Sequence, residues 1–176
     1  MLYNSRINEF NHDFNVEEID ILSILRKVIN DNKKILIRKR IFPEIIGEST
    51  LVQTDKKWMY FVISQLVINA VKYTSIAGRE KKFIKFIIRD EGKKISVCIK
   101  DNGIGIPKED IGRVFNEFFT GKNGRKSSES TGMGLYLSKY VCDYMGHELY
   151  VKSEEGQGAE FNVAFVKEKN IFNIKD

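Results

Sequence analysis

The pattern of apolar and polar positions along the chain predicts paired strands that alternate with helices. Within residues 55–74, apolar residues recur every three or four positions, which is the spacing of one helix face. Residues 82–90 and 93–101 instead alternate between apolar and polar, as strands with one buried face do. Glu91 and Gly92 between them suit a tight turn, so these two strands are predicted to be antiparallel neighbours.

The same criteria assign the remaining elements. Helices are predicted at 16–34, 55–74, 107–118 and 134–145, and strands at 35–42, 51–54, 82–90, 93–101, 147–153 and 158–166. Asp55 is predicted to cap the second helix, and Pro43 to end the first strand. The expected fold is an α/β two-layer sandwich, with a mixed, mostly antiparallel sheet covered on one face by helices.

Length and composition favour one compact domain. The chain has 176 residues, of which 42% are hydrophobic, and the expected organisation is a linker at 1–15, a domain at 16–166 and a tail at 167–176. No apolar run approaches the length that spans a bilayer, so the chain is expected to be soluble and to make no membrane contact itself.

The charged residues and cysteines exclude some classes of function. The net charge of +5 comes largely from scattered lysines, in short runs that alternate with apolar residues as a solvated strand face does, so no nucleic-acid partner is expected. Cys98 and Cys142 lie far apart without metal-ligand spacing, and are expected to be buried, reduced thiols of a cytosolic protein.

A group of polar residues lies beside the apolar stripe of the 55–74 helix. Gln65, Asn69, Lys72 and Tyr73 have the spacing of a single helix face. An Asn amide oxygen can bind Mg2+, and a Lys ammonium can neutralise phosphate. An ordinary solvated helix face would explain the same residues, and this segment alone does not decide between the two.

The segment DNGIGIP (101–107) follows a predicted strand. Asp101 has the parity of the apolar residues before it, so it is predicted to point toward the core, where a carboxylate needs a hydrogen-bond donor. The exocyclic amine of adenine is such a donor, whereas guanine presents an oxygen there. Gly103 and Gly105 would let a flat base approach the backbone. A simple strand-to-helix turn is the alternative.

Two further segments could bind phosphate. Three phenylalanines in 115–119 precede a polar loop that carries Lys122, Arg125 and Lys126. In 132–140, glycines open a predicted helix, whose first backbone N–H groups and positive dipole end would form an anion site.

Together and in this order, the four segments resemble the N box, first glycine box, F box and second glycine box of the histidine-kinase catalytic domain. This domain belongs to the GHKL ATP-binding family, shared with gyrase, MutL and the Hsp-type chaperones. NAVKYT (69–74), DNGIGIP and TGMGLYL (131–137) match the kinase forms nearly residue for residue. The resemblance covers 16–166 and implies the Bergerat ATP-binding fold, ATP with Mg2+, and protein-histidine kinase activity.

The resemblance also implies roles for the matching residues. Asn69 would hold Mg2+ on the triphosphate and Lys72 would contact phosphate, so these two are the predicted catalytic residues. Asp101 would bind the adenine amine. The other residues implied at the nucleotide are Gln65, Tyr73, Gly103, Gly105, Ile106, Phe119, Lys122, Arg125, Thr131, Gly132, Met133, Gly134 and Leu135.

The family's phosphoacceptor motif, a histidine followed by an acidic residue and then a proline on a long helix, is not found. His12 precedes Asp13 but lies in the predicted linker without a proline or heptads, so it is rejected as the acceptor. The implied partners are the dimerisation and phosphoacceptor domain of the same kinase and a cognate response regulator. The chain is then expected to be a cytoplasmic part of a longer protein anchored in the cell membrane.

FTGKNGR (119–125) further resembles the lid of the intramembrane-sensing kinases of Gram-positive bacteria, which answer cell-envelope and antibiotic stress. That resemblance implies a transporter-type sensory partner. Because residues 120–131 contain little that could be buried, the loop is expected to be mobile without nucleotide.

Two alternatives share the predicted fold. An ATP-hydrolysing switch of the gyrase and MutL type carries a Glu four residues before the Mg2+ asparagine, as general base for water. Gln65 has that place here, and an amide cannot accept a proton at neutral pH, so hydrolysis is expected to be poor. The other alternative is a nucleotide-binding module without catalysis, which the four intact boxes disfavour.

Overall fold

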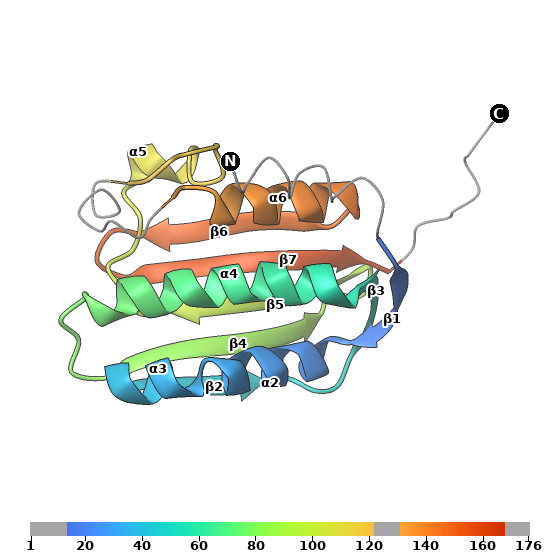
Figure 1. Cartoon of the computed structure of the whole chain (residues 1–176), viewed down its shortest axis with the longest axis horizontal. Coiled ribbons are helices and arrows are strands. Elements are labelled where there is room, and N and C mark those ends of the chain that lie inside the picture. The colour runs from blue at the N-terminus through green and yellow to red at the C-terminus, as the bar shows by residue number, and fades with distance from the viewer. Residues whose placement is uncertain (1–13, 122–130, 168–176) are drawn as a thin grey trace.

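The computed structural model describes residues 14–121 and 131–167, which form two layers (Figure 1). One layer is a five-stranded sheet, and the other is a set of helices across one of its faces. The strands are β1 (Val16–Asp20), β2 (Ile41–Ile46), β3 (Leu51–Asp55), β4 (Lys82–Asp90), β5 (Lys94–Asp101), β6 (Glu148–Glu154) and β7 (Gly158–Val166). The helices are α2 (Ile21–Asp31), α3 (Lys33–Lys39), α4 (Lys56–Ser75), α5 (Lys108–Ile111) and α6 (Gly134–Tyr144).

The sheet confirms the predicted fold class. Its strand order is β2-β4-β5-β7-β6, in which β2 and β4 are parallel and every other pair is antiparallel. The predicted β4–β5 hairpin forms as expected. In addition, β1 and β3 pair as a separate antiparallel ribbon at the side of the molecule.

Helix α4 lies across the middle of the sheet (Figure 1) and supplies the centre of the core. Its predicted apolar stripe is buried, and so are the strand residues that face the helix layer. The fully buried members are Met59, Ile63 and Leu66 of α4, Ile84 and Phe86 of β4, and Val97 and Ile99 of β5. Burial of such side chains contributes about 1.5–3 kcal/mol each relative to an exposed position, so this interface is a main source of stability.

The start of α4 is fixed by Asp55, as predicted. One carboxylate oxygen accepts a hydrogen bond from Trp58 N–H at 2.8 Å, and the other accepts one from Asn15 N–H at 2.7 Å. Phe14 stacks on Tyr144 with ring centroids 4.4 Å apart. The residues just before β1 therefore pack against the ends of α4 and α6.

The prediction of a helix from Val16 is wrong for its first five residues. They form β1, since they pair with β3 from Val16 opposite Asp55 to Asp20 opposite Leu51. Asp20 then caps α2 by accepting a hydrogen bond from Leu22 N–H at 3.0 Å. A tertiary strand pairing here overrides the local helical spacing.

The predicted strand 35–42 is also wrong over most of its length. Residues Lys33–Lys39 form α3, and the chain turns at Arg40, whose φ of 54° is left-handed. The strand β2 begins only at Ile41, and Pro43 lies inside it rather than ending it. Because β2 is an edge strand of the sheet, it can contain a proline.

The predicted helix 107–118 is reduced to the single turn α5. Turns follow it, and Phe118 has a left-handed φ of 57° with its side chain 67% exposed. Phe115 packs edge-on against Phe161, with centroids 6.3 Å apart. Residues 112–118 therefore form successive turns instead of a regular helix.

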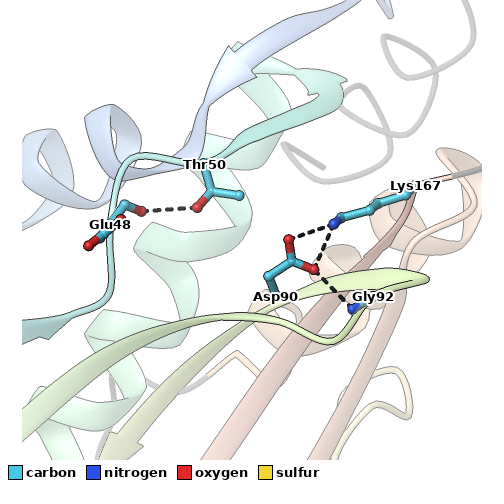
Figure 2. A network of polar contacts seen from close by, with 5 residues as sticks. All are labelled: Glu48, Thr50, Asp90, Gly92 and Lys167. Carbon is cyan, nitrogen blue, oxygen red and sulfur yellow. Dashed lines mark hydrogen bonds and ion pairs between the residues drawn. The ribbon is translucent and has the colours of Figure 1, made fainter.

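The β4–β5 turn and the end of β7 are joined by ion pairing, which Figure 2 shows. Asp90 accepts hydrogen bonds from Gly92 N–H at 2.9 Å and from Lys167 Nζ at 2.6 Å. The Lys167 ammonium, followed by the Gly92 amide, holds the pKa of the Asp90 carboxyl below its ordinary value. In the adjacent connection, the Thr50 hydroxyl donates to the Glu48 carbonyl at 3.0 Å.

Three side chains, Cys98, Cys142 and His147, lie inside the fold, as was expected for the two cysteines. Cys98 and Cys142 are both buried free thiols, and burial raises their pKa values to about 11 and about 12. His147 is buried, with Nε2 3.0 Å from the Thr54 hydroxyl. In the described part of the chain, these groups lie inside the fold and not at a reactive surface.

Candidate nucleotide-binding site

A cavity of about 840 Å³ opens beside the C-terminal half of α4. Its walls are α4, the β5–α5 loop (102–107), residues 119–121, the start of α6 and the β6–β7 turn (155–157). Helix α3 lines the remaining side, which we call the outer end. Most of the residues predicted at the nucleotide line it: Gln65, Asn69, Lys72, Tyr73, Asp101, Gly105, Ile106, Phe119, Thr131, Gly132, Gly134 and Leu135. Segments far apart in sequence thus meet at one site.

Two predicted residues do not line the cavity. A Cβ atom on Gly103 would lie 2.9 Å from the backbone of Tyr73, so this glycine permits close contact between the β5–α5 loop and α4. Met133 is 2% exposed and belongs to the core under the start of α6. Lys122 and Arg125, together with most of the predicted mobile loop, lie outside the described residues.

Asp101 is the buried acid of the cavity. It is 4% exposed and lies at the end of β5, on the sheet face that packs against the helices, as its parity predicted. Burial raises the pKa of its carboxyl to about 6, although hydrogen bonds from the backbone of Gly103, at 2.8 Å, and Ala159 oppose the rise. The carboxylate keeps acceptor capacity beyond these bonds, since two oxygens provide about four lone-pair sites.

The polar face of α4 lies along one wall. Gln65, Asn69, Lys72 and Tyr73 all line the cavity, so this face is not simply solvated. The Lys72 ammonium lies over the Tyr73 ring, 5.1 Å from its centroid, and burial raises the pKa of the Tyr73 hydroxyl. The helix therefore presents amides and a cation to the cavity at successive turns.

The N-terminus of α6 forms an adjoining wall. Its first helical hydrogen bond joins Leu137 N–H to Met133 C=O at 2.9 Å, so the amides of the residues between them precede the helical ladder. Such amides, with the positive end of the helix dipole, favour an anion. Gly134 at this position lies against α4, because a Cβ atom there would overlap the Gln65 side-chain oxygen.

Sequence reasoning missed the outer end of the cavity. Asn32, just before α3, and Ile35, Arg38 and Lys39 of α3 line it together with Ile68, which is 50% exposed on α4. Residues 32–34 were predicted to end a helix and residues 35–42 to form a strand, and neither segment contained a motif that pointed to a site. This end combines the half-buried Ile35 and the exposed Ile68 with a basic rim.

The donor set fits a Mg2+ ion that is shared with a phosphate chain. Asn69 and Gln65 contribute amide oxygens on neighbouring turns of α4, and such oxygens are suitable ligands for Mg2+. Among the described residues there is no group of three or more His, Cys, Asp or Glu side chains that could hold a metal by themselves. A metal bound mainly through substrate phosphates and one or two protein oxygens matches this arrangement.

The fold and the site define an ATPase-like nucleotide-binding domain, and comparison with known families agrees. Residues 54–170 match the family described as "Histidine kinase-, DNA gyrase B-, and HSP90-like ATPase". The match extends over more than half of the chain and includes all four segments discussed above. The chain belongs to this family.

Its relatives are sensor kinases of Gram-positive bacteria. The chain is 37% identical over 167 residues to the sensor histidine kinase YxdK of Bacillus subtilis, covering 94% of this chain and 50% of that protein. It is 35% identical over 164 residues to the sensor protein BceS of the same organism, covering 93% and 48% respectively. The chain thus spans about half the length of the curated relatives it matches.

Solved structures share the fold. The catalytic domain of histidine kinase ThkA superposes with a TM-score of 0.73 at 24% identity, covering 87% of this chain and 96% of that one. The histidine kinase AdeS of Acinetobacter baumannii superposes with a TM-score of 0.74 at 20% identity, covering 94% and 74%. In the part of our chain that the structure describes, no helix has the length and apolar character needed to cross a membrane.

Proposed function

We propose that this chain is the ATP-binding catalytic part of a two-component sensor histidine kinase. It would present the γ-phosphate of ATP to a histidine on a dimerisation domain outside this chain. The observation that carries the proposal is the position of buried Asp101 in the same cavity as Asn69 and the N-terminus of α6. A base-recognition group and two phosphate-binding features thus share one space of nucleotide size.

Asp101 would select adenine. Its buried carboxylate accepts two backbone hydrogen bonds and can accept a further one from the exocyclic amine of the base. Guanine would place its carbonyl oxygen opposite the carboxylate. Two hydrogen-bond acceptors would then face each other in a buried site without a donor, which is unfavourable. Ile106 and Gly105 line the same end of the cavity, where the flat base would lie.

The phosphate groups would lie between α4 and α6. When bound, Mg2+ would neutralise charge on the phosphates, with Asn69 as its protein ligand. The Lys72 ammonium and the first amides of α6 would bind phosphate oxygens, since both line the cavity. Phosphoryl transfer then depends mainly on positioning and charge stabilisation by these groups.

Gln65 favours a kinase over a hydrolase. It stands one helical turn before Asn69 and lines the cavity, at the place where the related hydrolases carry a glutamate base. Because an amide cannot accept the proton of an attacking water, the bound ATP would persist until an acceptor imidazole arrives. A purely nucleotide-binding role would need no surface beside the site for an acceptor helix.

The outer end of the cavity would receive the histidine-bearing helix. Ile35 and Ile68 supply an apolar surface, and Arg38 and Lys39 supply positive charge beside it. The family's acceptor histidine is followed by an acidic residue, which is complementary to that rim. The contact would bring the acceptor imidazole to the phosphate end of the site.

The wider setting is also proposed from the relatives. The full-length protein would be anchored in the membrane, with this chain on the cytoplasmic side, and would pass phosphate to a cognate response regulator. In support, a solved complex of histidine kinase ThkA contains the response regulator protein TrrA. A transporter-type sensory partner stays a prediction from the FTGKNGR segment.

Isothermal titration of the chain with ATP and GTP, each with and without Mg2+, tests the proposal. We expect ATP to bind, Mg2+ to strengthen the binding, and GTP to bind far more weakly. Equal affinity for ATP and GTP would refute the adenine site, and no effect of Mg2+ would refute the role of Asn69.

A further inference from the structure

The β5–α5 loop is hydrogen-bonded to the β6–β7 hairpin through a serine that carries no expected role. The Ser153 hydroxyl accepts a hydrogen bond from Ile106 N–H at 2.9 Å and donates one to Gly158 C=O at 2.7 Å. A second link runs directly between the two backbones, from Gly156 N–H to Ile104 C=O at 2.7 Å. One side-chain oxygen therefore joins the loop that lines the cavity to the hairpin beside it.

Arg79, in the α4–β4 connection, makes a second side-chain link between the loop and the hairpin. Its Nε donates to Asn102 C=O at 3.2 Å, and its Nη2 donates to Gly156 C=O. The planar guanidinium thus holds one carbonyl of the loop and one of the hairpin at a set separation. Although the Arg79 side chain is exposed, it contacts two backbones that converge on the cavity.

Both links affect the same two groups of the site. The hairpin supplies the Ala159 backbone hydrogen bond to the Asp101 carboxylate, and the loop carries Ile106 in the cavity wall. The distance between the Asp101 carboxylate and Ile106 therefore depends on how the β5–α5 loop packs against the β6–β7 hairpin. Neither Ser153 nor Arg79 lines the cavity itself.

We propose that Ser153 and Arg79 are positioning residues for adenine, which act by holding the β5–α5 loop against the β6–β7 hairpin. The inference rests on the proposed nucleotide site. It predicts that losing either link weakens recognition of the base and leaves recognition of the phosphates intact. Loss of a residue that served only the stability of the fold would not weaken base recognition selectively over phosphate recognition.

The first test is titration of Ser153→Ala with ATP, ADP and GTP. We expect the ATP dissociation constant to rise about fivefold, as for loss of one ordinary hydrogen bond. The ATP-to-ADP affinity ratio should stay at its wild-type value, while the ATP-to-GTP ratio falls. Ser153→Thr keeps a hydroxyl and should recover wild-type affinity. Ser96→Ala is the matched control, because Ser96 is buried in β5 and donates to Glu91 at 2.8 Å without lining the cavity.

Arg79→Ala repeats the test at an exposed position where folding is not at risk, with the exposed Arg26→Ala on α2 as its control. We expect the same pattern, a lower ATP-to-GTP ratio and an unchanged ATP-to-ADP ratio. Thermal melting of each variant accompanies the titrations. An unchanged ATP-to-GTP ratio in both variants would overturn the inference, whatever the melting midpoint does. If the wild-type chain does not bind ATP, that result refutes the proposed function, and this inference, which rests on it, is refuted too.

Discussion

The backbone at Gly105 lies directly against Glu154, so closely that a Cβ atom on Gly105 would overlap the Glu154 carbonyl oxygen. Gly105 also has a left-handed φ of 71°. The second glycine of the β5–α5 loop is thus required by contact with the β6–β7 hairpin as well as by backbone conformation. This contact seats the loop at the cavity.

Gly105→Ala should therefore lower ATP affinity by at least about tenfold and lower the free energy of unfolding, because both strain and steric overlap act on it. The matched control is Gly92→Ala, since Gly92 has a φ of 79° but no atom within 4 Å of its built Cβ. That variant bears the backbone strain alone and should keep wild-type ATP affinity. Titration and chemical denaturation of both variants check the prediction, and equal ATP binding by the two would contradict it.

Asp101→Asn should cost ATP binding about 1.5–3 kcal/mol, the range for a hydrogen bond with a charged partner. The substitution keeps the shape but removes the charge and replaces one acceptor oxygen with a donor. GTP binding, weak in the wild type, should not weaken further. Titration of both nucleotides against wild type and variant gives the answer, and an equal loss for ATP and GTP would argue against base recognition by this residue.

ATP affinity should fall as the pH is lowered through about 6, where the structure places the pKa of Asp101. The ionised carboxylate is the stronger acceptor for the adenine amine, so binding is strongest above this pKa and weakens as the group is protonated. Titrations from about pH 8 to about pH 5 on wild type and Asp101→Asn measure this. The decline should be smaller in the variant, where only groups other than Asp101, such as the phosphates of ATP, still titrate. A parallel decline in both proteins would assign the effect to those other groups.

The same shift has an opposite consequence for the empty protein. Because burial raises the pKa of Asp101 in the folded state from 3.8 to about 6, its protonated form favours folding. The stability from this group is fully present below the unfolded pKa and is lost as pH rises through about 6. At pH 7, Asp101→Asn should therefore melt no lower than wild type without nucleotide, although it binds ATP poorly. A markedly lower melting midpoint would show that the backbone hydrogen bonds outweigh burial.

The chain alone should bind Mg2+-ATP without phosphorylating itself and without appreciable release of phosphate. Gln65 provides no base for water, and His147 is buried away from the cavity. Adding the histidine-bearing helical domain of the full-length protein should start phosphotransfer, and Asn69→Asp should abolish it by disturbing Mg2+ binding. Radiolabelled ATP is the assay. Acid-labile label on the chain alone would point to His12, and brisk phosphate release would favour the hydrolase alternative.

Ile68→Glu should reduce that transfer by at least about tenfold, which is much more than it lowers ATP affinity, because a carboxylate at the outer end of the cavity would repel the acidic residue expected on the histidine-bearing helix. Ile37→Glu is the control: Ile37 is 76% exposed on α3 and does not line the cavity. Transfer should be normal in the control. If both variants transfer phosphate at the wild-type rate, the helix docks elsewhere.

The amino-acid sequence by itself determined the elements with long, regular patterns. Helix α4 has twenty residues with a stripe at helix spacing and an Asp cap, and β4 and β5 alternate around a Glu-Gly turn, so local periodicity was sufficient. The candidate site followed because its residues come in short motifs on these elements. Their spacing placed Gln65, Asn69 and Lys72 on one face before any fold was known.

Only the tertiary structure determined the secondary structure of the short segments and the full set of residues that line the cavity. Val16–Asp20 became a strand because β3 lies beside it, and Lys33–Lys39 became a helix although its apolar residues fitted a strand equally well. Segments of five to seven residues contain too few positions to distinguish the two periods, so packing against the rest of the chain determines them. For the same reason the α3 wall, and the contacts of Ser153 and Arg79, appear only once the chain is folded.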